Sequence, residues 1–349
     1  MNVIDKTLFN HCIEQLKDID KLWIKRKRKI NTLTIFYYLL DSAITNKGLY
    51  TFTKINNHFS HVSLIKARKK LPIDIFYNLN FKINQINPIK NHIYAIDGSK
   101  IRVHTGFTKY GYKTRTNDKD VKRKAKRPLA MLSSLHGINS DTTINYCITK
   151  HFNERKTIEF LIKDLPKGSI VIMDRGYFSL NVYNTFLSHK IHCIMRLKKD
   201  ANKHVYKFYK SKNNVKIVNF IENNKFLKIK LIKYYIDNNL YIIGTSLINS
   251  TLNQLKKYYK MRWRVEISFK RLKSHLNINK IHSRTENLWL QELQFRILID
   301  SISHSTQTQY VNIKSNNIKY IHTYVYIVYS LKKYVSSLYY IFNYHQSIT

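Results

Sequence analysis

Acidic residues are scarce in this sequence. It holds 21 aspartates and glutamates against 61 lysines and arginines, a formal net charge of +40. So large a surplus of one sign works against a compact state unless a polyanion offsets it. Nucleic acid is the first candidate partner, and an anionic membrane surface is the second.

Cysteines and long apolar runs are scarce as well. Cys12, Cys147 and Cys193 are odd in number and far apart, so neither a disulfide framework nor a zinc knuckle is indicated. No apolar run has the length needed to span a bilayer. Residues 1–12 lack the basic-then-apolar order of a signal peptide. We therefore expect a cytoplasmic protein without membrane contact, associated with the nucleoid if the cell is prokaryotic.

The basic residues recur along the chain instead of forming one tail. They gather in five stretches: 21–30, 66–71, 109–128, 203–233 and 256–280. In these stretches lysines and arginines alternate with Leu, Ile, Phe and Tyr, which is typical of folded elements with basic outer faces. Several such faces predict a long nucleic-acid groove. The aromatic side chains could stack on bases or pack in the core.

Apolar spacing divides the chain into five predicted regions. Residues 1–90 read as a helical DNA-binding region, where Ser60 caps a helix that Pro72 stops. Its helix-turn-helix-like outline is also common in ordinary helical segments. Residues 91–199 alternate strands and helices, the pattern of an α/β fold with a mixed sheet. A β-rich segment at 200–250, a core helix within 251–290 and a helical region at 291–349 follow.

Two of the few carboxylates follow short apolar strands. Asp97 ends the run "IYAID" and Asp174 ends the run "IVIMD". Active sites of α/β folds gather at such strand ends, although an aspartate also commonly forms a turn there. Clustered carboxylates raise each other's pKa unless a cation offsets them. Oxygen ligands favour Mg²⁺ or Mn²⁺, and two such ions can activate a nucleophile at a phosphodiester.

A third carboxylate, Glu266, lies in the basic stretch 258–276. On a single helix, an apolar stripe forms from Met261, Val265, Phe269, Leu272 and Leu276. The flank of that stripe carries Tyr259, Arg262, Glu266 and Lys273. Lys260, Arg264 and Arg271 are expected to point towards solvent or DNA. Glu266 is then either a metal ligand or an ordinary i,i+4 partner of a nearby cation.

The spacing Tyr259-x2-Arg262-x3-Glu266-x6-Lys273 resembles the signature of DDE transposases of the insertion sequence 4 type. "AIDGS" around Asp97 and "MDRGYFS" around Asp174 resemble the blocks that hold that family's first two catalytic aspartates. The resemblance covers roughly residues 60–290, including "SLIKARKKLP" at 63–72.

The resemblance implies an RNase H-like mixed-sheet core with Asp97, Asp174 and Glu266 as catalytic metal ligands. The implied cofactor is Mg²⁺ or Mn²⁺, as two ions. Tyr259, Arg262 and Lys273 would bind DNA phosphates. Residues 200–250 correspond to a β-rich insertion, in which some relatives stack a tryptophan near a flipped base. Here the candidates are Tyr234, Tyr235 and Phe226, and Trp263 is assigned to packing.

The implied reaction is cut-and-paste transposition. Water cleaves the element's end, the freed 3′-hydroxyl makes a hairpin, and the reopened end joins target DNA. The partners would be double-stranded element ends and target DNA, bound by a homodimer. Three alternatives stay open: a transposase-derived DNA-binding protein, a metal-dependent nuclease without strand transfer, and a non-enzymatic basic RNA-binding or structural protein.

Overall fold

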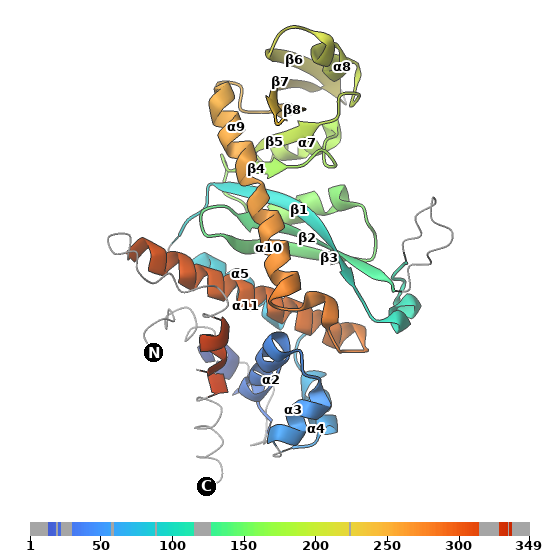
Figure 1. The fold of residues 1–349 in the computed structure, drawn as a ribbon, viewed down its shortest axis with the longest axis vertical. Coiled ribbons are helices and arrows are strands. Elements are labelled where there is room, and N and C mark those ends of the chain that lie inside the picture. The colour runs from blue at the N-terminus through green and yellow to red at the C-terminus, as the bar shows by residue number, and fades with distance from the viewer. Residues whose placement is uncertain are drawn as a thin grey trace.

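The computed structural model describes residues 13–18, 20–21, 30–56, 59–87, 89–114, 127–222, 225–313, 328–333 and 335–336, with only the backbone at 222, 225 and 307–313. The molecule is elongated (Figure 1). Helices within residues 32–68 lie at one end, the central strands in the middle, and the strands within residues 215–245 at the other end.

The N-terminal region is helical, as predicted. It comprises α2 (Thr32–Thr45), α3 (Leu49–Asn56), α4 (His61–Arg68) and α5 (Ile75–Ile86). The side chain of Ser60 caps α4 by accepting a hydrogen bond from the Ser63 N–H at 3.1 Å. The helix ends at Arg68, four residues before Pro72.

One eight-stranded mixed sheet organises the rest of the molecule. Its order is β3-β2-β1-β4-β5-β8-β7-β6. In chain order the strands are β1 (Ile93–Arg102), β2 (Leu129–Gly137), β3 (Thr142–Thr149), β4 (Ile170–Met173), β5 (His192–Leu197), β6 (Val215–Glu222), β7 (Lys225–Ile236) and β8 (Asn239–Thr245). The pairs β1–β4 and β4–β5 are parallel, and the others are antiparallel.

The prediction that a first strand ends at Asp97 is wrong. Strand β1 continues through Asp97 and Gly98 to Arg102. The reason is its long antiparallel partner β2, which pairs Asp97 with Ser134 and Gly98 with Ser133. Strand β4, on the other side of β1, does end at Met173. Asp97 therefore lies inside a strand but beyond the end of its neighbour.

Residues 200–250 are β-rich but begin with a helix that we did not predict, α8 (Lys203–Lys210). The ammonium group of Lys233 donates to the carbonyls of Phe208 and Tyr209 at the end of this helix. Strands β6–β8 extend the central sheet, because β8 pairs with β5 from Ile194↔Thr245 onward. Residues 223–224, between β6 and β7, lie outside the described residues.

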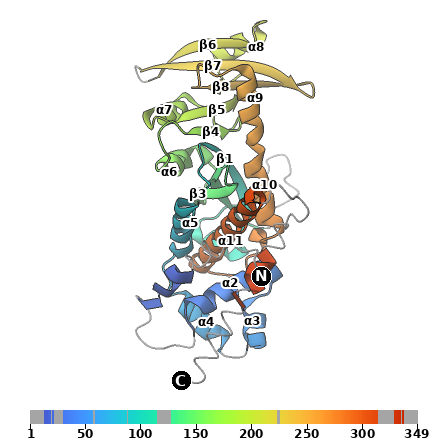
Figure 2. The ribbon, with the colours of Figure 1, turned by 90° about the vertical axis from the view of Figure 1, so that its left-hand side faces the viewer.

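Helices cover both faces of the sheet (Figure 2). Helices α6 (Ile158–Ile162) and α7 (Leu180–Ser188) pack on one face with Tyr94 and Ile96 of β1. The opposite face, which carries Ala95 and Ile101, packs against α10 (Trp263–Ser274) and α11 (Glu286–Ile313). Short 3₁₀ turns η1 (Thr105–Tyr110), η2 (Glu154–Thr157) and η3 (Ile278–Lys280) complete the element order.

The predicted single helix over 258–276 is two helices. Helix α9 (Leu252–Met261) ends at Arg262, and α10 begins at Trp263. The backbone of Arg262 stays right-handed, so the chain continues in nearly the same direction. The apolar stripe is confirmed, since Val265, Phe269, Leu272 and Leu276 are buried.

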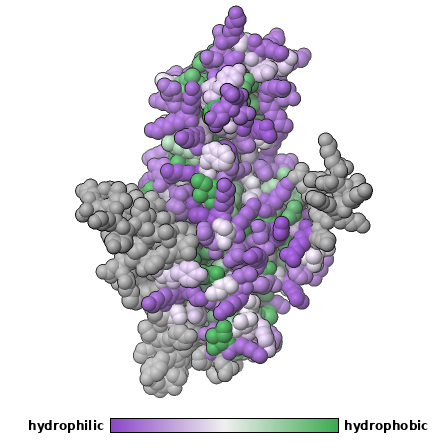
Figure 3. Space-filling model, in the orientation of Figure 1, coloured by the Kyte–Doolittle hydropathy of each residue, from purple (hydrophilic) through white to green (hydrophobic). Residues whose placement is uncertain are grey.

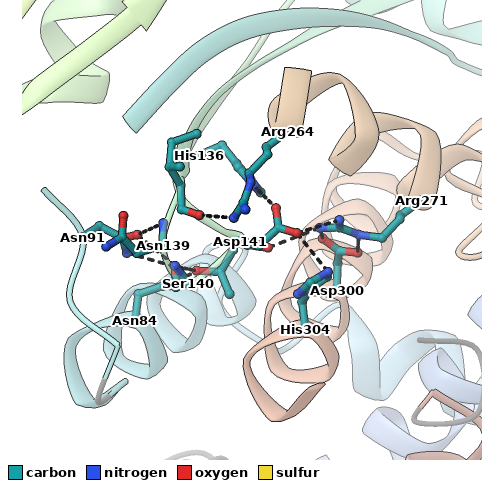
Figure 4. A network of polar contacts seen from close by, with 12 residues as sticks. Asn84, Asn91, His136, Asn139, Ser140, Asp141, Arg264, Arg271, Asp300 and His304 are labelled. Carbon is teal, nitrogen blue, oxygen red and sulfur yellow. Dashed lines mark hydrogen bonds and ion pairs between the residues drawn. The ribbon is translucent and has the colours of Figure 1, made fainter. Parts of the chain in front are cut away.

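Arg271 does not point towards solvent, contrary to the prediction. It is buried in a polar network (Figure 4), with its Nε 3.2 Å from Asp300 Oδ1 and its Nη1 3.4 Å from Asp141 Oδ2. His136 and His304 also contact the Asp141 carboxylate. The long side chain of Arg271 reaches the buried carboxylate of Asp300 and the partly buried carboxylate of Asp141, which explains its burial. Arg264 is exposed but donates to the Ile138 carbonyl at 2.6 Å, and Lys260 is exposed.

Parts of the predictions fall outside the described residues. In the basic stretch 109–128, residues 115–126 lie outside the described residues. In the predicted C-terminal region, residues 314–327 and 337–349 do. Among the described helices, none is long and apolar enough to cross a membrane. The division into five regions stays a prediction.

Candidate active site

Asp97 and Asp174 lie level on neighbouring strands. The parallel register of β1 and β4 pairs Ile96 with Met173, and the two aspartates follow directly. Asp174 starts a tight turn in which the Tyr177 N–H donates to the Asp174 carbonyl at 3.2 Å. Two residues far apart in the sequence thus lie side by side at the carboxyl end of β4, in the middle of the sheet.

Helices α9 and α10 bring the predicted flank to these aspartates. The Tyr259 hydroxyl donates to Asp174 Oδ1 at 3.1 Å. Arg262 lies between the other two carboxylates, with Nη2 2.7 Å from Glu266 Oε1 and Nη1 3.6 Å from Asp97 Oδ2. The structure therefore brings Asp97, Asp174, Tyr259, Arg262 and Glu266 into one cluster.

Glu266 has a cation partner, and its role as a metal ligand stays a prediction. It does pair with a cation at i,i+4 spacing, because Arg262 is its partner. The same guanidinium also reaches Asp97, so the pair belongs to the carboxylate cluster and is not an isolated helix contact. The side chain of Arg262 is only 7% exposed, which strengthens these interactions relative to a surface pair.

Burial and charge set the electrostatics of the cluster. Burial, assisted by the charges of Glu154 and Glu266, raises the pKa of Asp97 to about 6, while the Gly98 N–H and Arg262 oppose the shift. Burial and the nearby Asp174 raise the pKa of Tyr259, so its hydroxyl stays protonated as a donor.

Lys273 is not part of this cluster. It lies seven residues beyond Glu266 on α10 and is half-buried, and burial lowers its pKa. Among the described residues it forms no ion pair with the three carboxylates. Its predicted role in binding a DNA phosphate stays a prediction.

Sequence reasoning missed three residues next to the cluster. Arg196, on β5, has its Nη1 4.0 Å from Asp174 Oδ1 and its guanidinium 4.1 Å from the Tyr241 ring centroid. The feature of the sequence that could have indicated Arg196 is its single charge in the otherwise apolar strand "IHCIMRL". Glu154 and Tyr177 lie on the other face of the sheet, where no spacing rule connects them to Asp97.

A pocket of about 600 Å³ opens beside Tyr259 between β7, β8 and α9. Aromatic and basic side chains line it, including Tyr235, Tyr241, Trp263 and Lys260. The assignment of Trp263 to packing is wrong, because it is 54% exposed. Phe226 is exposed outside this pocket, whereas Tyr234 lies in its wall, stacked on Tyr241 with ring centroids 5.7 Å apart.

The donor set fits a hard divalent cation. Among the described residues, no three His, Cys, Asp or Glu side chains converge closely enough to hold a metal ion, since Arg262 stands between Asp97 and Glu266. The oxygens present are carboxylates, which Mg²⁺ and Mn²⁺ prefer. The raised pKa of Asp97 means that an added cation would relieve an unfavourable charge.

Comparisons with known proteins identify the family of this chain. A family model described as "Transposase DDE domain" matches residues 89–299. A Synechocystis sp. protein named "Putative transposase for insertion sequence element IS4SA" is 27% identical over an alignment of 168 residues, with 43% of this chain and 46% of that protein covered. The match thus spans about half the length of that relative.

A solved structure shares the fold. The piggyBac transposase in a synaptic complex with hairpin DNA superposes with a TM-score of 0.57 at 12% identity, covering 93% of this chain and 76% of that one. The sheet is therefore RNase H-like, as predicted. Because the family model covers more than half of the sequence, the chain belongs to the DDE transposase family.

Proposed function

We propose that this chain cleaves DNA at the ends of an insertion sequence and joins the freed ends to target DNA. Asp97, Asp174 and Glu266 would be its catalytic residues. The observation that carries the proposal is the meeting of Asp97 and Asp174 at the end of β4, with Tyr259 and Arg262 bonded to the same cluster.

The family generally uses divalent metal ions, and the three carboxylates would hold Mg²⁺ or Mn²⁺, as two ions. When bound, such ions lower the pKa of an attacking water or hydroxyl and offset charge on the departing oxygen. Asp97 lies beside Asp174 across the β1–β4 pair and is linked to Glu266 through Arg262, so these three residues would hold the ions.

The chain's own groups position the carboxylates and the DNA. The Tyr259 hydroxyl fixes one oxygen of Asp174, which leaves the other free for a ligand. Arg262 offsets the negative charge of Asp97 and Glu266, and its planar guanidinium suits phosphate oxygens. Lys273 would bind a further phosphate along α10.

In cleavage, water adds to phosphorus while the 3′-oxygen leaves with a proton.

The DNA would lie across the hydrophilic face. Figure 3 shows hydrophilic side chains over the end of the molecule that carries β6–β8. Trp263 and Tyr235 in the pocket beside Tyr259 are placed to stack on an unpaired base at the DNA end. We further propose that helices within 1–90 bind DNA, that two copies act as a homodimer on it, and that the protein works at the nucleoid.

Incubating the full-length protein with the DNA that flanks its gene tests the proposal. We expect Mg²⁺-dependent cleavage at a terminal inverted repeat, followed by joining to a second DNA. Cleavage without joining would identify a nuclease, and binding without cleavage would identify a transposase-derived DNA-binding protein. A preference for RNA with no cut in DNA would favour the basic RNA-binding alternative.

A further inference from the structure

Glu154 is a half-buried carboxylate beside the cluster but on the other face of the sheet. It lies in η2, after β3. A methyl group added at Gly98, the residue after Asp97, would lie 2.5 Å from Glu154 Oε1. The carboxylate therefore occupies the space that a side chain at residue 98 would fill.

A second contact holds Glu154 at the catalytic edge. The neighbouring Arg155 donates from its Nε to the Gly176 carbonyl at 2.9 Å, inside the turn that begins at Asp174. The 3₁₀ turn η2 is thus tied to both aspartate-bearing segments, to β1 through Gly98 and to the 174–177 turn through Arg155.

Glu154 lacks a cation of its own. In a chain with 61 lysines and arginines, it forms no ion pair with any described residue. Half-buried carboxylates are normally paired. Its charge acts on Asp97 more strongly than the charge of Glu266 does.

Tyr177 points to a ligand in the same place. Its side chain is 1% exposed, and its hydroxyl makes no hydrogen bond of good geometry with a described residue. Glu154 acts on this hydroxyl through its charge and through a side-chain contact, and Asp97 and Asp174 act on it through their charges. The Tyr177 hydroxyl therefore faces the carboxylates, where it can hold Glu154 or a water bound to a cation.

We propose that Glu154 is a fourth carboxylate of the catalytic centre, which completes the cation position of Asp97 and Asp174 from the face opposite Glu266. The proposal rests on the proposed function. Glu266, with Arg262, approaches Asp97 from the α10 side, whereas Glu154 and Tyr177 approach from the side of α6 and α7. Asp97 is then flanked by a carboxylate on each face of the sheet.

Mn²⁺ binding to the DNA-free, full-length protein tests this, with free Mn²⁺ counted by electron paramagnetic resonance. We expect Glu154→Gln to weaken Mn²⁺ binding about tenfold or more. The control Glu159→Gln, an exposed glutamate one turn further along, should bind Mn²⁺ like the wild type. Urea unfolding of each variant separates a loss of ligand from a loss of fold.

Gly98→Ala provides a second test that keeps every carboxylate. Its methyl group would displace the Glu154 carboxylate, so Mn²⁺ binding should again weaken. If Glu154→Gln and Gly98→Ala both bind Mn²⁺ with wild-type affinity while Asp97→Asn binds it poorly, the role of Glu154 is overturned and the proposed function is not. Wild-type affinity in Asp97→Asn as well would overturn the proposed function with it.

Discussion

At the scale of single residues, hydroxyl and guanidinium groups hold the carboxylates of the site. Tyr259 fixes Asp174, and Arg262 bridges Asp97 and Glu266. Each contact preorganises a side chain that would otherwise sample several rotamers. Misplacement of such groups costs catalysis even when every ligand is present.

The Tyr259→Phe protein should cleave DNA ends roughly tenfold to a hundredfold more slowly. The reason is the lost hydrogen bond to a charged oxygen of Asp174, of about 1.5–3 kcal/mol. Single-turnover cleavage measures the effect. Tyr258→Phe, next to it in the chain, is the control and should react at the wild-type rate. An unchanged rate for Tyr259→Phe would show that this bond does not matter to the reaction.

Residue spacing predicted part of this site. Tyr259, Arg262 and Glu266 share a helical flank, and the flank prediction needs only 100° per residue. Glu154 and Arg196 escaped because they are single charges that approach through tertiary contacts. No local pattern encodes a residue that fills the space above a glycine on another strand.

At the scale of elements, helix α10 decides where Glu266 lies. Arg271 secures this helix, because it contacts Asp141 in the β2–β3 turn and Asp300 on α11 (Figure 4). Asp141 has a left-handed backbone, with φ of 53°, which an aspartate tolerates better than most residues. The network thus ties the helix to the sheet and to α11.

Asp141 should make the protein's stability sensitive to acid. Burial opposes its ionisation, but the hydrogen bond and charge of His136, with His304 and Arg271, lower the pKa of Asp141 to about 2. A carboxyl group whose pKa is lower in the folded state than in the unfolded state stabilises the folded protein. This contribution is complete above the pKa of the unfolded state, near pH 4, and is lost as the pH falls towards 2.

Urea unfolding between pH 7 and pH 2 measures this contribution. The Asp141→Asn protein should be less stable than wild type at neutral pH, by about 2 kcal/mol or more. The gap should narrow below pH 4. Asp164→Asn, at an exposed position, is the control and should follow the wild-type curve. A gap that stays constant down to pH 2 would refute the role of Asp141 ionisation.

Helices and strands could be predicted where the spacing of apolar residues was clear. The residues at which they begin and end were harder to predict. The apolar stripe of α10 followed from the sequence, whereas the break at Arg262 and the continuation of β1 past Asp97 did not. Both depend on partners: a strand continues as long as its neighbour β2 pairs with it. The burial of Arg271 likewise depends on two carboxylates from other elements.

At the scale of the whole molecule, one sheet runs from the core into β6–β8. The sequence predicted the β-rich segment as an insertion, but pairing between β8 and β5 is long-range and leaves no local signal. The molecule is elongated, and the lysines and arginines behind the net charge of +40 recur along its sequence. A DNA duplex could therefore contact several basic faces at once.

Affinity for DNA of unrelated sequence should fall steeply with salt. Each neutralised phosphate contributes a slope of about −0.9 in the log–log dependence, so six or more contacts give roughly a thousandfold loss between 50 and 200 mM salt. Fluorescence anisotropy of a labelled duplex follows the change. A flat dependence on salt would contradict binding along several basic faces.

The central claim is that Asp97, Asp174 and Glu266 form one DNA-cleaving centre. Cleavage of terminal DNA in Mg²⁺ by Glu266→Gln tests it most directly, with Glu159→Gln as the matched control and DNA binding measured for both. The account predicts that Glu266→Gln binds the DNA but does not cut it, while Glu159→Gln does both. Wild-type cleavage by Glu266→Gln would contradict the account.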